Sequence, residues 1–330
     1  MFRRVSTRPI AQRAFTAGAF RTFATAAKQK QSSWNWSRTA FFTGSGIAAS
    51  AVITSSVVFC ATQAKGDQPP FNYKAVRKDI EALLDDDITQ GPILVRLAWH
   101  EAGSWDAKAK DGAPNSGSMR FEPECKYGGN AGLQIARTLL EPIKKKHPNI
   151  TYGDLWSLAG CIAIEAMAGP EIKWRWGRHE AKSGKECGPD GRLPDASKGQ
   201  GHVRDVFYRM GFNDREIVAL LGAHAIGECH PDRSGYSGPW TNDKYGFSNA
   251  FFTELVGNDW IVNKDKPNLQ FKDSTSGQLM MLPSDIALIL DPKFKKIVNE
   301  YAKNQDVFFK DFAKAFQKLV ELGQLDLKDV

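Results

Sequence analysis

The sequence predicts a mainly α-helical globular domain that begins near residue 67 and contains one minor β-hairpin. Apolar residues recur at helical spacing along most of the chain after that point, and helix start and stop signals recur with them. The chain is 330 residues long and 42% hydrophobic, which is enough to bury a large core. It contains no internal repeat of about 20–50 residues, so a repeat array is excluded.

The first 66 residues differ in composition from the rest. They contain nine Lys or Arg and no Asp or Glu. Residues 1–38 are rich in Arg, Ser and Thr, which is typical of a mitochondrial transit peptide. Residues 39–66 carry almost no charge and could cross a bilayer, but they are diluted by Gly, Ser, Thr and Ala. We interpret them as a sorting segment that is removed, with a retained inner-membrane anchor as the alternative. Both interpretations place the domain at 67–330 in the intermembrane space.

That domain is slightly acidic. It contains 35 Lys or Arg and 37 Asp or Glu, because nine of the chain's 44 basic residues precede it. A nucleic-acid-binding function would need a basic surface and is therefore not supported. The five Cys residues form no CxxC spacing, and their scattered positions argue against a disulfide framework.

Ten segments of the domain show helical periodicity. Four of them begin with a first-turn Pro or an N-cap side chain, at Pro92, Asn130, Thr151 and Asn213. The expected helices span 72–85, 91–104, 130–146, 151–168, 202–210, 213–226, 248–256, 284–289, 291–303 and 305–322.

Three other segments interrupt the helical pattern. The stretches 105–129 and 177–201 are rich in Gly, Pro, Ser and charged residues. Their length is typical of functional loops rather than plain connections. The segment 258–282 is expected to hold the short hairpin.

The segment GPILVRLAWHEAG carries the first candidate functional residues. Arg96, Trp99 and His100 lie at positions i, i+3 and i+4, so a helix presents them on one face. A lone His would fit a structural or surface role. Three such groups together are costly to bury unless they meet a polar ligand or an anion. The motif therefore predicts one wall of a binding site.

The segment ALLGAHAIGECH carries the second candidate. His224 ends a nearly apolar helix, and its neighbours Ala223, Ala225 and Gly227 are small enough for a large flat group to approach the ring. Alone, His224 would fit a core imidazole bonded to a backbone carbonyl. Together, the two motifs favour a haem site in which His224 ligates the iron and the opposite side stays open.

Six motifs that occur in order resemble those of the class I haem peroxidases. The resemblance runs from about residue 72 to the C-terminus and is greatest to the mitochondrial members that oxidise cytochrome c. It implies a two-lobed helical body that clasps one haem b between the helices at 91–104 and 213–226, and the reduction of hydrogen peroxide to water. The motifs are RLAWHEAG (96–103), NAGL (130–133), GRLPD (191–195), VALLGAHAIG (218–227), SGYSGPW (234–240) and MMLPSD (280–285).

The resemblance assigns roles on the peroxide side of the haem. His100 matches the residue that moves a proton from one peroxide oxygen to the other. Arg96 matches the residue that stabilises the negative charge developing as the O–O bond breaks. Trp99 matches an indole that packs over the haem and donates a hydrogen bond there. Asn130 matches the residue that fixes the imidazole, although an N-cap role at helix 130–146 is an equally good local interpretation.

On the other side, Asp285 matches the carboxylate that accepts the Nδ1 proton of His224 and raises the basicity of this ligand. It could also cap the helix at 284–289. Trp240 matches an indole that holds a radical in the members that oxidise cytochrome c, with a plain core aromatic as the alternative. His230 matches a residue near a haem carboxylate.

The electron donor is implied by residues outside this core. Asp85, Asp86 and Asp87 lie near the acidic patch that meets a basic protein in the members that oxidise cytochrome c, although an acidic run also fits a solvated surface. Arg233 stands where the ascorbate-oxidising members bind ascorbate, although it also fits a solvated loop. We expect ferrocytochrome c as the donor, with an ascorbate or dual-donor peroxidase as the alternative.

Two positions depart from the family pattern. Ala225 stands where the ascorbate-oxidising members use a Thr in a potassium site, so we expect no potassium near Trp240. Glu228 replaces the Lys or Arg usual at its place, which puts the usual contacts to the haem carboxylates in doubt. A non-catalytic haem-based peroxide sensor is the alternative outside enzymes. A sensor would have no need of residues that stabilise a leaving oxygen.

Overall fold

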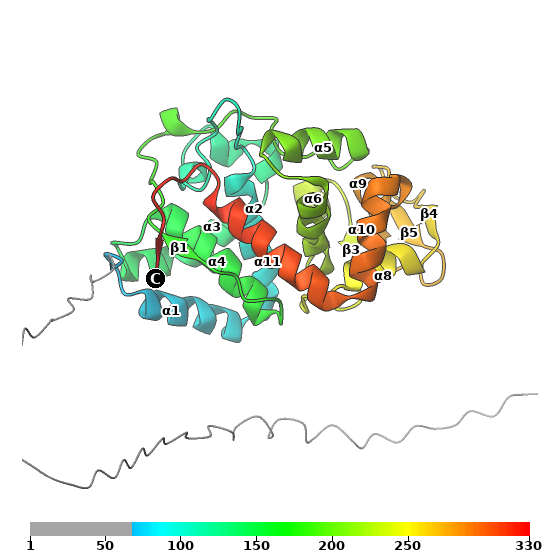
Figure 1. Cartoon of the computed structure of the whole chain (residues 1–330), viewed down its shortest axis with the longest axis horizontal. Helices are drawn as coiled ribbons and strands as arrows, with labels where there is room; N and C mark the ends of the chain where they lie inside the picture. Colours follow the sequence, from blue (N-terminus) through cyan, green and yellow to red (C-terminus); the bar gives the residue numbers. More distant parts are fainter. Residues whose placement is uncertain (1–67) are drawn as a thin grey trace, which may run out of the picture. The chain divides into compact units, whose positions relative to one another are not determined.

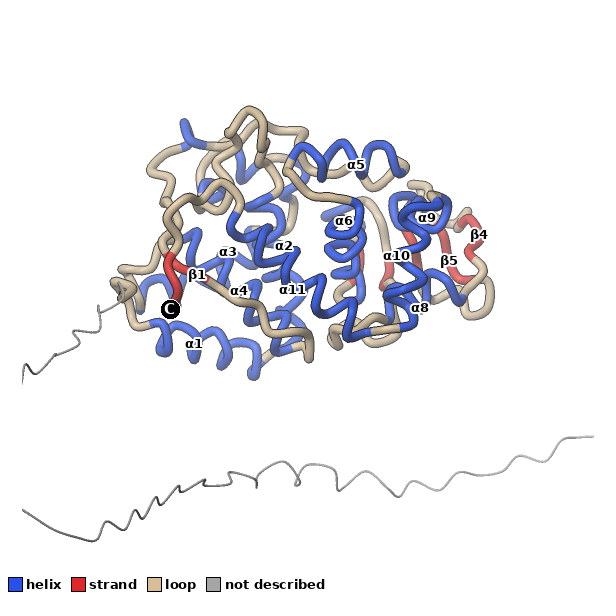
Figure 2. Tube along the Cα trace, in the orientation of Figure 1, coloured by secondary structure: helices blue, strands red, loops and turns tan. Residues whose placement is uncertain are grey.

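The computed structural model describes residues 68–330 (Figure 1). The transit peptide and the sorting segment predicted at 1–38 and 39–66 lie outside the described residues. Helices dominate this part of the chain and the strands are short, which confirms the predicted mainly α fold (Figure 2). No helix in residues 68–330 has both the length and the apolar composition that crossing a bilayer requires.

The predicted helices are present, with ends that differ by a few residues. The helix expected at 213–226 is divided into α6 and a 3-10 turn, η6, which contains His224. The short helix α7 was not predicted. The α-helices are α1 (Tyr73–Asp86), α2 (Gly91–Ala102), α3 (Gln134–Lys146), α4 (Tyr152–Ala166), α5 (Gln200–Arg209), α6 (Asp214–Leu221), α7 (Pro231–Ser234), α8 (Ala250–Gly257), α9 (Pro283–Leu290), α10 (Pro292–Lys303) and α11 (Gln305–Glu321). The 3-10 turns are η1 (Ile88–Gln90), η2 (Ser118–Arg120), η3 (Glu124–Lys126), η4 (Gly128–Asn130), η5 (Gly184–Glu186) and η6 (Gly222–Ala225).

Helices α1 to α4 form one lobe, in which α4 is central. Thr151 caps α4, because its hydroxyl accepts the backbone N–H of Asp154 at 3.0 Å. Most of α4 is buried, since α1, α2 and α3 pack against it. Helix α2 approaches α4 most closely at Gly160, where an added Cβ would lie only 2.6 Å from the Cβ of Ala98. This close packing fixes α2 and the motif that it carries.

Helices α6 and α8 to α10 form the second lobe around a cluster of aromatic rings. The rings of Phe252, Tyr301 and Phe308 lie with centroids 5.0–5.6 Å apart. Gly222, at the start of η6, abuts the same rings, and a Cβ there would lie 2.5 Å from Phe308. Helix α11 connects the lobes, because it packs against α6 in one and α2 in the other (Figure 1).

Three small antiparallel sheets complete the described part of the chain. The hairpin expected at 258–282 is confirmed by β4 and β5, and a third strand, β6, pairs with β5. The sheet register places Trp260 opposite Asp273 and Phe271 opposite Met281. The strands are β1 (Arg175–Trp176) with β7 (Lys328–Asp329), β2 (Glu228–Cys229) with β3 (Gly238–Pro239), and β4 (Trp260–Val262), β5 (Phe271–Asp273) and β6 (Met280–Met281).

Helix α3 begins four residues later than predicted. We expected a helix to start at Asn130, but α3 starts at Gln134. Gly132 has a φ of +83°, a left-handed conformation that does not continue a helix. The side chain of Asn130 bonds instead to residues far from α3 in sequence, His100 and Glu124. The N-cap interpretation of Asn130 is therefore wrong.

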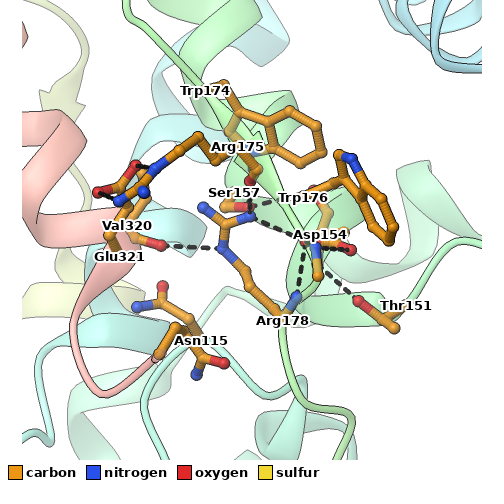
Figure 3. Close-up of polar contacts among 12 residues, drawn as sticks. Asn115, Thr151, Asp154, Ser157, Trp174, Arg175, Trp176, Arg178, Val320 and Glu321 are labelled. Atoms are coloured by element: carbon orange, nitrogen blue, oxygen red, sulfur yellow. Dashed lines mark hydrogen bonds and ion pairs between the residues drawn. The ribbon is translucent and has the colours of Figure 1, made fainter. Parts of the chain in front are cut away.

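A buried ion pair joins α4 to the segment after β1 and to α11 (Figure 3). The side chains of Asp154 and Arg178 are 2% and 0% exposed, and Nη1 lies 2.8 Å from Oδ1. Arg178 also donates from Nε to the Val320 carbonyl at 2.9 Å, and Asp154 accepts the backbone N–H of Gly177. Both charges thus have further polar partners, which a buried ion pair needs to be tolerated.

Replacing Asp154 by Ala would leave the Arg178 guanidinium buried without its counter-charge. Breaking a buried pair from one side typically costs about 3–5 kcal/mol, so we expect the free energy of unfolding to fall by that amount. The matched control is Glu300→Ala, which removes a partner of Arg215 in a pair that is over 40% exposed and should cost at most about 1 kcal/mol. Urea denaturation measures both. Equal losses would contradict the importance of burial here.

Candidate active site

A cavity of about 520 Å³ lies between α2 in the first lobe and η6 in the second. It brings together the two motifs singled out in the sequence. Arg96, Trp99 and His100 line one wall, and His224 and Trp240 line the other. Apolar side chains from both lobes complete it, among them Pro92, Val95, Leu193, Val203, Phe207, Leu220, Ile226 and Leu282.

A chain of hydrogen bonds orients His100. Its Nδ1 lies 3.1 Å from Oδ1 of Asn130, and Nδ2 of Asn130 donates to the backbone carbonyl of Glu124 at 2.9 Å. Because the Asn130 amide nitrogen donates to a carbonyl, the amide oxygen must face the imidazole and accept a hydrogen bond from the N–H at Nδ1. This assigns the tautomer of His100 and leaves Nε2 as a proton acceptor.

The electrostatics of this wall keep His100 uncharged. Burial and the positive charge of Arg96 lower the pKa of His100 to about 3. Burial and the nearby charge of Arg233 lower the pKa of Arg96 to about 10, so its guanidinium still carries its charge at neutral pH. The wall therefore presents a neutral base beside a cation.

Two other contacts fix the side chains of this wall. Arg96 donates to the carbonyl oxygens of Gly129 and Ala131, both at 2.9 Å. Trp99 stacks on Phe207, with ring centroids 5.1 Å apart. Trp99 is thus held between the cavity and α5.

On the opposite wall, one carboxylate holds the two rings. Asp285 is fully buried, and its Oδ1 lies 2.9 Å from Nδ1 of His224. Its Oδ2 accepts the indole N–H of Trp240 at 2.8 Å. The rings of His224 and Trp240 are stacked with centroids 4.2 Å apart. Since Nδ1 is engaged, Nε2 of His224 is the nitrogen available to a metal.

Asp285 also has the local role suggested by its position. It is the third residue of α9, and its Oδ2 accepts the backbone N–H of Leu282 at 2.8 Å. The carboxylate therefore closes the start of α9 while it orients His224 and Trp240. The two roles proposed for Asp285 occur together.

Polar residues after η6 form one edge of the cavity. His230, Arg233, Glu228 and Lys244 all line it. Nε of Arg233 is buried and has no hydrogen-bond partner within residues 68–330. Cys229 also lines this edge, and burial raises the pKa of its thiol to about 12, which keeps it a poor nucleophile.

The three acidic residues at the end of α1 do not behave alike. Asp85 and Asp86 are exposed. Asp87 accepts hydrogen bonds from the backbone N–H and hydroxyl of Thr89 and from the amide of Gln90, at 2.5–3.0 Å. These bonds lower the pKa of Asp87 and cap η1. Two of the three carboxylates are therefore free to face a partner.

A pair of buried carboxyl groups behind His100 was missed by the sequence analysis. Oε1 of Glu101 accepts the backbone N–H groups of Gly117 at 2.5 Å and Ser118 at 3.1 Å, and the Ser118 hydroxyl donates to Glu124 at 2.7 Å. Oε2 of Glu101 has no hydrogen-bond partner in the described chain. Burial and the charge of Glu124 raise the pKa of Glu101 well above 4.5. The available signal was Glu101 itself, the single acidic residue of the predicted helix 91–104.

These features fit a flat, mostly apolar group that carries a metal and acidic substituents. The walls are largely apolar, His224 offers one nitrogen, and the small residues beside it leave space at the ring. Nε of Arg233 lies 3.8 Å from Oδ2 of Asp232 but has no hydrogen-bond partner in residues 68–330, so it can donate to a carboxylate of the bound group. Haem, the cofactor implied by the sequence, has this chemistry.

Known proteins provide an independent comparison. The sequence profile of the family described as Peroxidase matches residues 76–304. The chain is 55% identical over 252 residues to the mitochondrial cytochrome c peroxidase of Aspergillus fumigatus. The matched segment covers 76% of this chain and 69% of that protein. It is 51% identical over 262 residues to the mitochondrial cytochrome c peroxidase of Pyricularia oryzae, covering 78% and 72%. It is 51% identical over 263 residues to a Pyricularia oryzae protein named as a heme-binding peroxidase, covering 77% and 88%.

The raised pKa of Glu101 makes folding stability depend on pH. A carboxyl whose pKa is higher in the folded than in the unfolded state loses stability as pH rises from its ordinary value of 4.5 through the raised value. Glu101→Gln removes this titration and keeps an oxygen acceptor for Gly117 and Ser118. We expect its free energy of unfolding to fall less steeply with rising pH than that of the wild type.

Urea denaturation at several pH values from 4.5 upward measures this slope. The control is Glu122→Gln, because the Glu122 side chain is 64% exposed. The same slope in the wild type and Glu101→Gln would show that Glu101 is ionised in the folded protein throughout this range.

Proposed function

The chain belongs to the peroxidase family, and on that premise we propose that it is a mitochondrial haem peroxidase that reduces hydrogen peroxide to water with electrons from ferrocytochrome c. One observation carries this proposal. A neutral, oriented His100 beside the Arg96 cation faces, across one cavity, an imidazole whose Nδ1 is held by Asp285. The names of the relatives in Aspergillus and Pyricularia support cytochrome c as the donor and the mitochondrion as the compartment.

We infer that His224 holds the haem iron through Nε2, and that Arg233 and His230 face the haem carboxylates. The haem supplies an iron that exchanges electrons with peroxide. A non-covalently held haem b is supported by the sequence, since it contains no CxxCH motif for covalent attachment.

His100 and Arg96 would perform the proton and charge steps. Nε2 of His100 takes the proton from one oxygen of hydrogen peroxide and delivers it to the other, so that this oxygen leaves as water. The guanidinium of Arg96 stabilises the negative charge that develops on the departing oxygen. Asn130 keeps Nδ1 of His100 protonated, which leaves Nε2 free to act. Overall, one peroxide takes up two electrons and two protons and gives two waters.

Asp285 and Trp240 would serve the opposite wall. The carboxylate draws the Nδ1 proton of His224 and makes the imidazole a stronger electron donor to a bound metal. Trp240, which stacks on His224 and donates to the same carboxylate, is positioned to relay electrons one at a time. Two ferrocytochrome c molecules then deliver the two electrons in separate encounters.

We infer that Asp85 and Asp86 help to attract the basic donor, because they are exposed and the domain is slightly acidic. Ascorbate is not favoured, since the relatives reported above that are named for a donor are named for cytochrome c. We also expect no potassium ion near Trp240. Ala225 has no side-chain oxygen to offer a cation, where the ascorbate-oxidising members use a Thr. The presequence composition supports the intermembrane space as the location.

Removing the proton acceptor should slow the reaction with peroxide. We expect His100→Leu to retain haem but to reduce the second-order rate constant for peroxide by about 10²–10⁴-fold, the usual range for a positioned acid–base group. Because the pKa of His100 is about 3, this rate in the wild type should not fall through loss of the base until the pH approaches that value. Stopped-flow mixing with peroxide measures both. The control is His179→Leu, whose side chain is 62% exposed; an unchanged rate in His100→Leu would refute the mechanism.

Removing the relay should separate the two half-reactions. We expect Trp240→Phe to react with peroxide at nearly the wild-type rate but to lose most steady-state turnover with cytochrome c. Turnover with cytochrome c should also fall as salt rises, because salt screens the attraction between exposed charges of the two proteins over about 8 Å at physiological ionic strength. Trp176→Phe, at an indole outside the cavity, is the matched control. Wild-type turnover with ascorbate and none with cytochrome c would overturn the choice of donor.

A further inference from the structure

An ion pair lies at the edge of the cavity on the side of His224. Nζ of Lys244 lies 2.5 Å from Oε1 of Glu228, and the two side chains are 31% and 29% exposed. Both residues line the cavity. Glu228 belongs to β2, shortly after His224, whereas Lys244 lies in the loop after Trp240. Glu228 departs from the family pattern, and Lys244 is its ion-pair partner.

The backbone holds the loop that carries Lys244. The N–H of Gly227 donates to the Lys244 carbonyl at 2.7 Å, and the hydroxyl of Thr241 donates to the carbonyls of Ala225 at 2.7 Å and Asp243 at 3.2 Å. The loop would therefore stay in place without the ion pair. The side-chain contact of Lys244 with Glu228 is an additional interaction, and its role is electrostatic rather than architectural.

The charges around the cavity indicate what this pair does. Three cationic side chains, Arg96, Arg233 and Lys244, and two acidic ones, Asp195 and Glu228, line the cavity. Haem carries two carboxylates, so a cavity with excess positive charge favours it. Without Lys244 the cationic and acidic side chains would be equal in number, and Glu228 would repel those carboxylates across a partly desolvated wall. Bonding to Glu228 raises the pKa of Lys244, which keeps it protonated.

We propose that Lys244 is a haem-retaining residue that neutralises Glu228 and thereby preserves the excess positive charge of the cavity. The proposal rests on the proposed function only in that haem is the bound group. The two partners have opposite effects, because the Lys244 cation helps to retain haem and the Glu228 carboxylate opposes its binding.

The test is a double-mutant cycle on the haem-loaded protein, read as the rate of haem transfer to excess apomyoglobin by absorbance. We expect Lys244→Met to speed haem loss by about tenfold, which corresponds to about 1.4 kcal/mol. Glu228→Gln should leave the rate unchanged or slow it. The double variant Glu228→Gln/Lys244→Met should return close to the wild type, and Lys244→Arg should match the wild type.

Two controls separate this role from a structural one. Lys318→Met breaks an ion pair with Glu216 of similar exposure that lies outside the cavity, and it should not change haem loss. Thermal unfolding of each haem-free variant reports on the fold alone. Higher salt should reduce the difference between Lys244→Met and the wild type.

The outcomes are distinct. Equal acceleration by Lys244→Met and Glu228→Gln would show a clasp that holds the loop and would overturn the proposal. No change in either variant would overturn it as well. If Lys244→Met does not fold, Glu228→Gln and the double variant still decide, because the proposal requires both to retain haem at least nearly as well as the wild type. A wild-type protein that binds no haem would refute the proposed function instead.

Discussion

The buried carboxylate of Asp285 is the interaction on which the site depends. It has no contact with solvent, and it accepts from three donors, which are the imidazole of His224, the indole of Trp240 and the backbone N–H of Leu282. A buried charge is tolerated only with such a full set of partners. One side chain thereby fixes the start of α9, the stacking of the two rings and the tautomer of His224. None of these could shift without leaving a donor unpaired.

The two histidines that face each other across the cavity have different partners at Nδ1. His100 is buried beside the positive charge of Arg96, and its Nδ1 faces only the neutral amide of Asn130. Its pKa is therefore low, and its Nε2 remains a base. His224 lies against a carboxylate, which makes it electron-rich. The two histidines differ in the groups at Nδ1 and in the nearby charges, and this difference fits the proton-carrying role proposed for His100 and the metal-ligand role proposed for His224.

In the first lobe, a neutral amide and a backbone carbonyl orient His100, and no charged side chain bonds to its Nδ1. The amide of Asn130 is aimed by the carbonyl of Glu124, and the segment around Glu124 is held by Ser118, which also donates to Glu101. Two carboxyl groups that would repel each other when ionised are thus placed behind an imidazole that must remain neutral. The raised pKa of Glu101 favours its uncharged form. This keeps His100 neutral, since an anion at Glu101 would favour the imidazolium.

The sequence by itself determined the mainly α fold, the approximate position of each predicted helix and the identity of the residues on each wall. These follow from local rules, since Arg96, Trp99 and His100 share a face by spacing alone, and the caps at Thr151 and Asn213 need only neighbouring residues. Only the tertiary structure decided the rest. Asn130 has the composition of an N-cap, but its amide is used by His100, which lies 30 residues earlier in the chain. The partner of Glu228 and the proximity of Glu101 to Glu124 were likewise invisible, because these pairs form only when separate segments pack, and burial then sets their protonation.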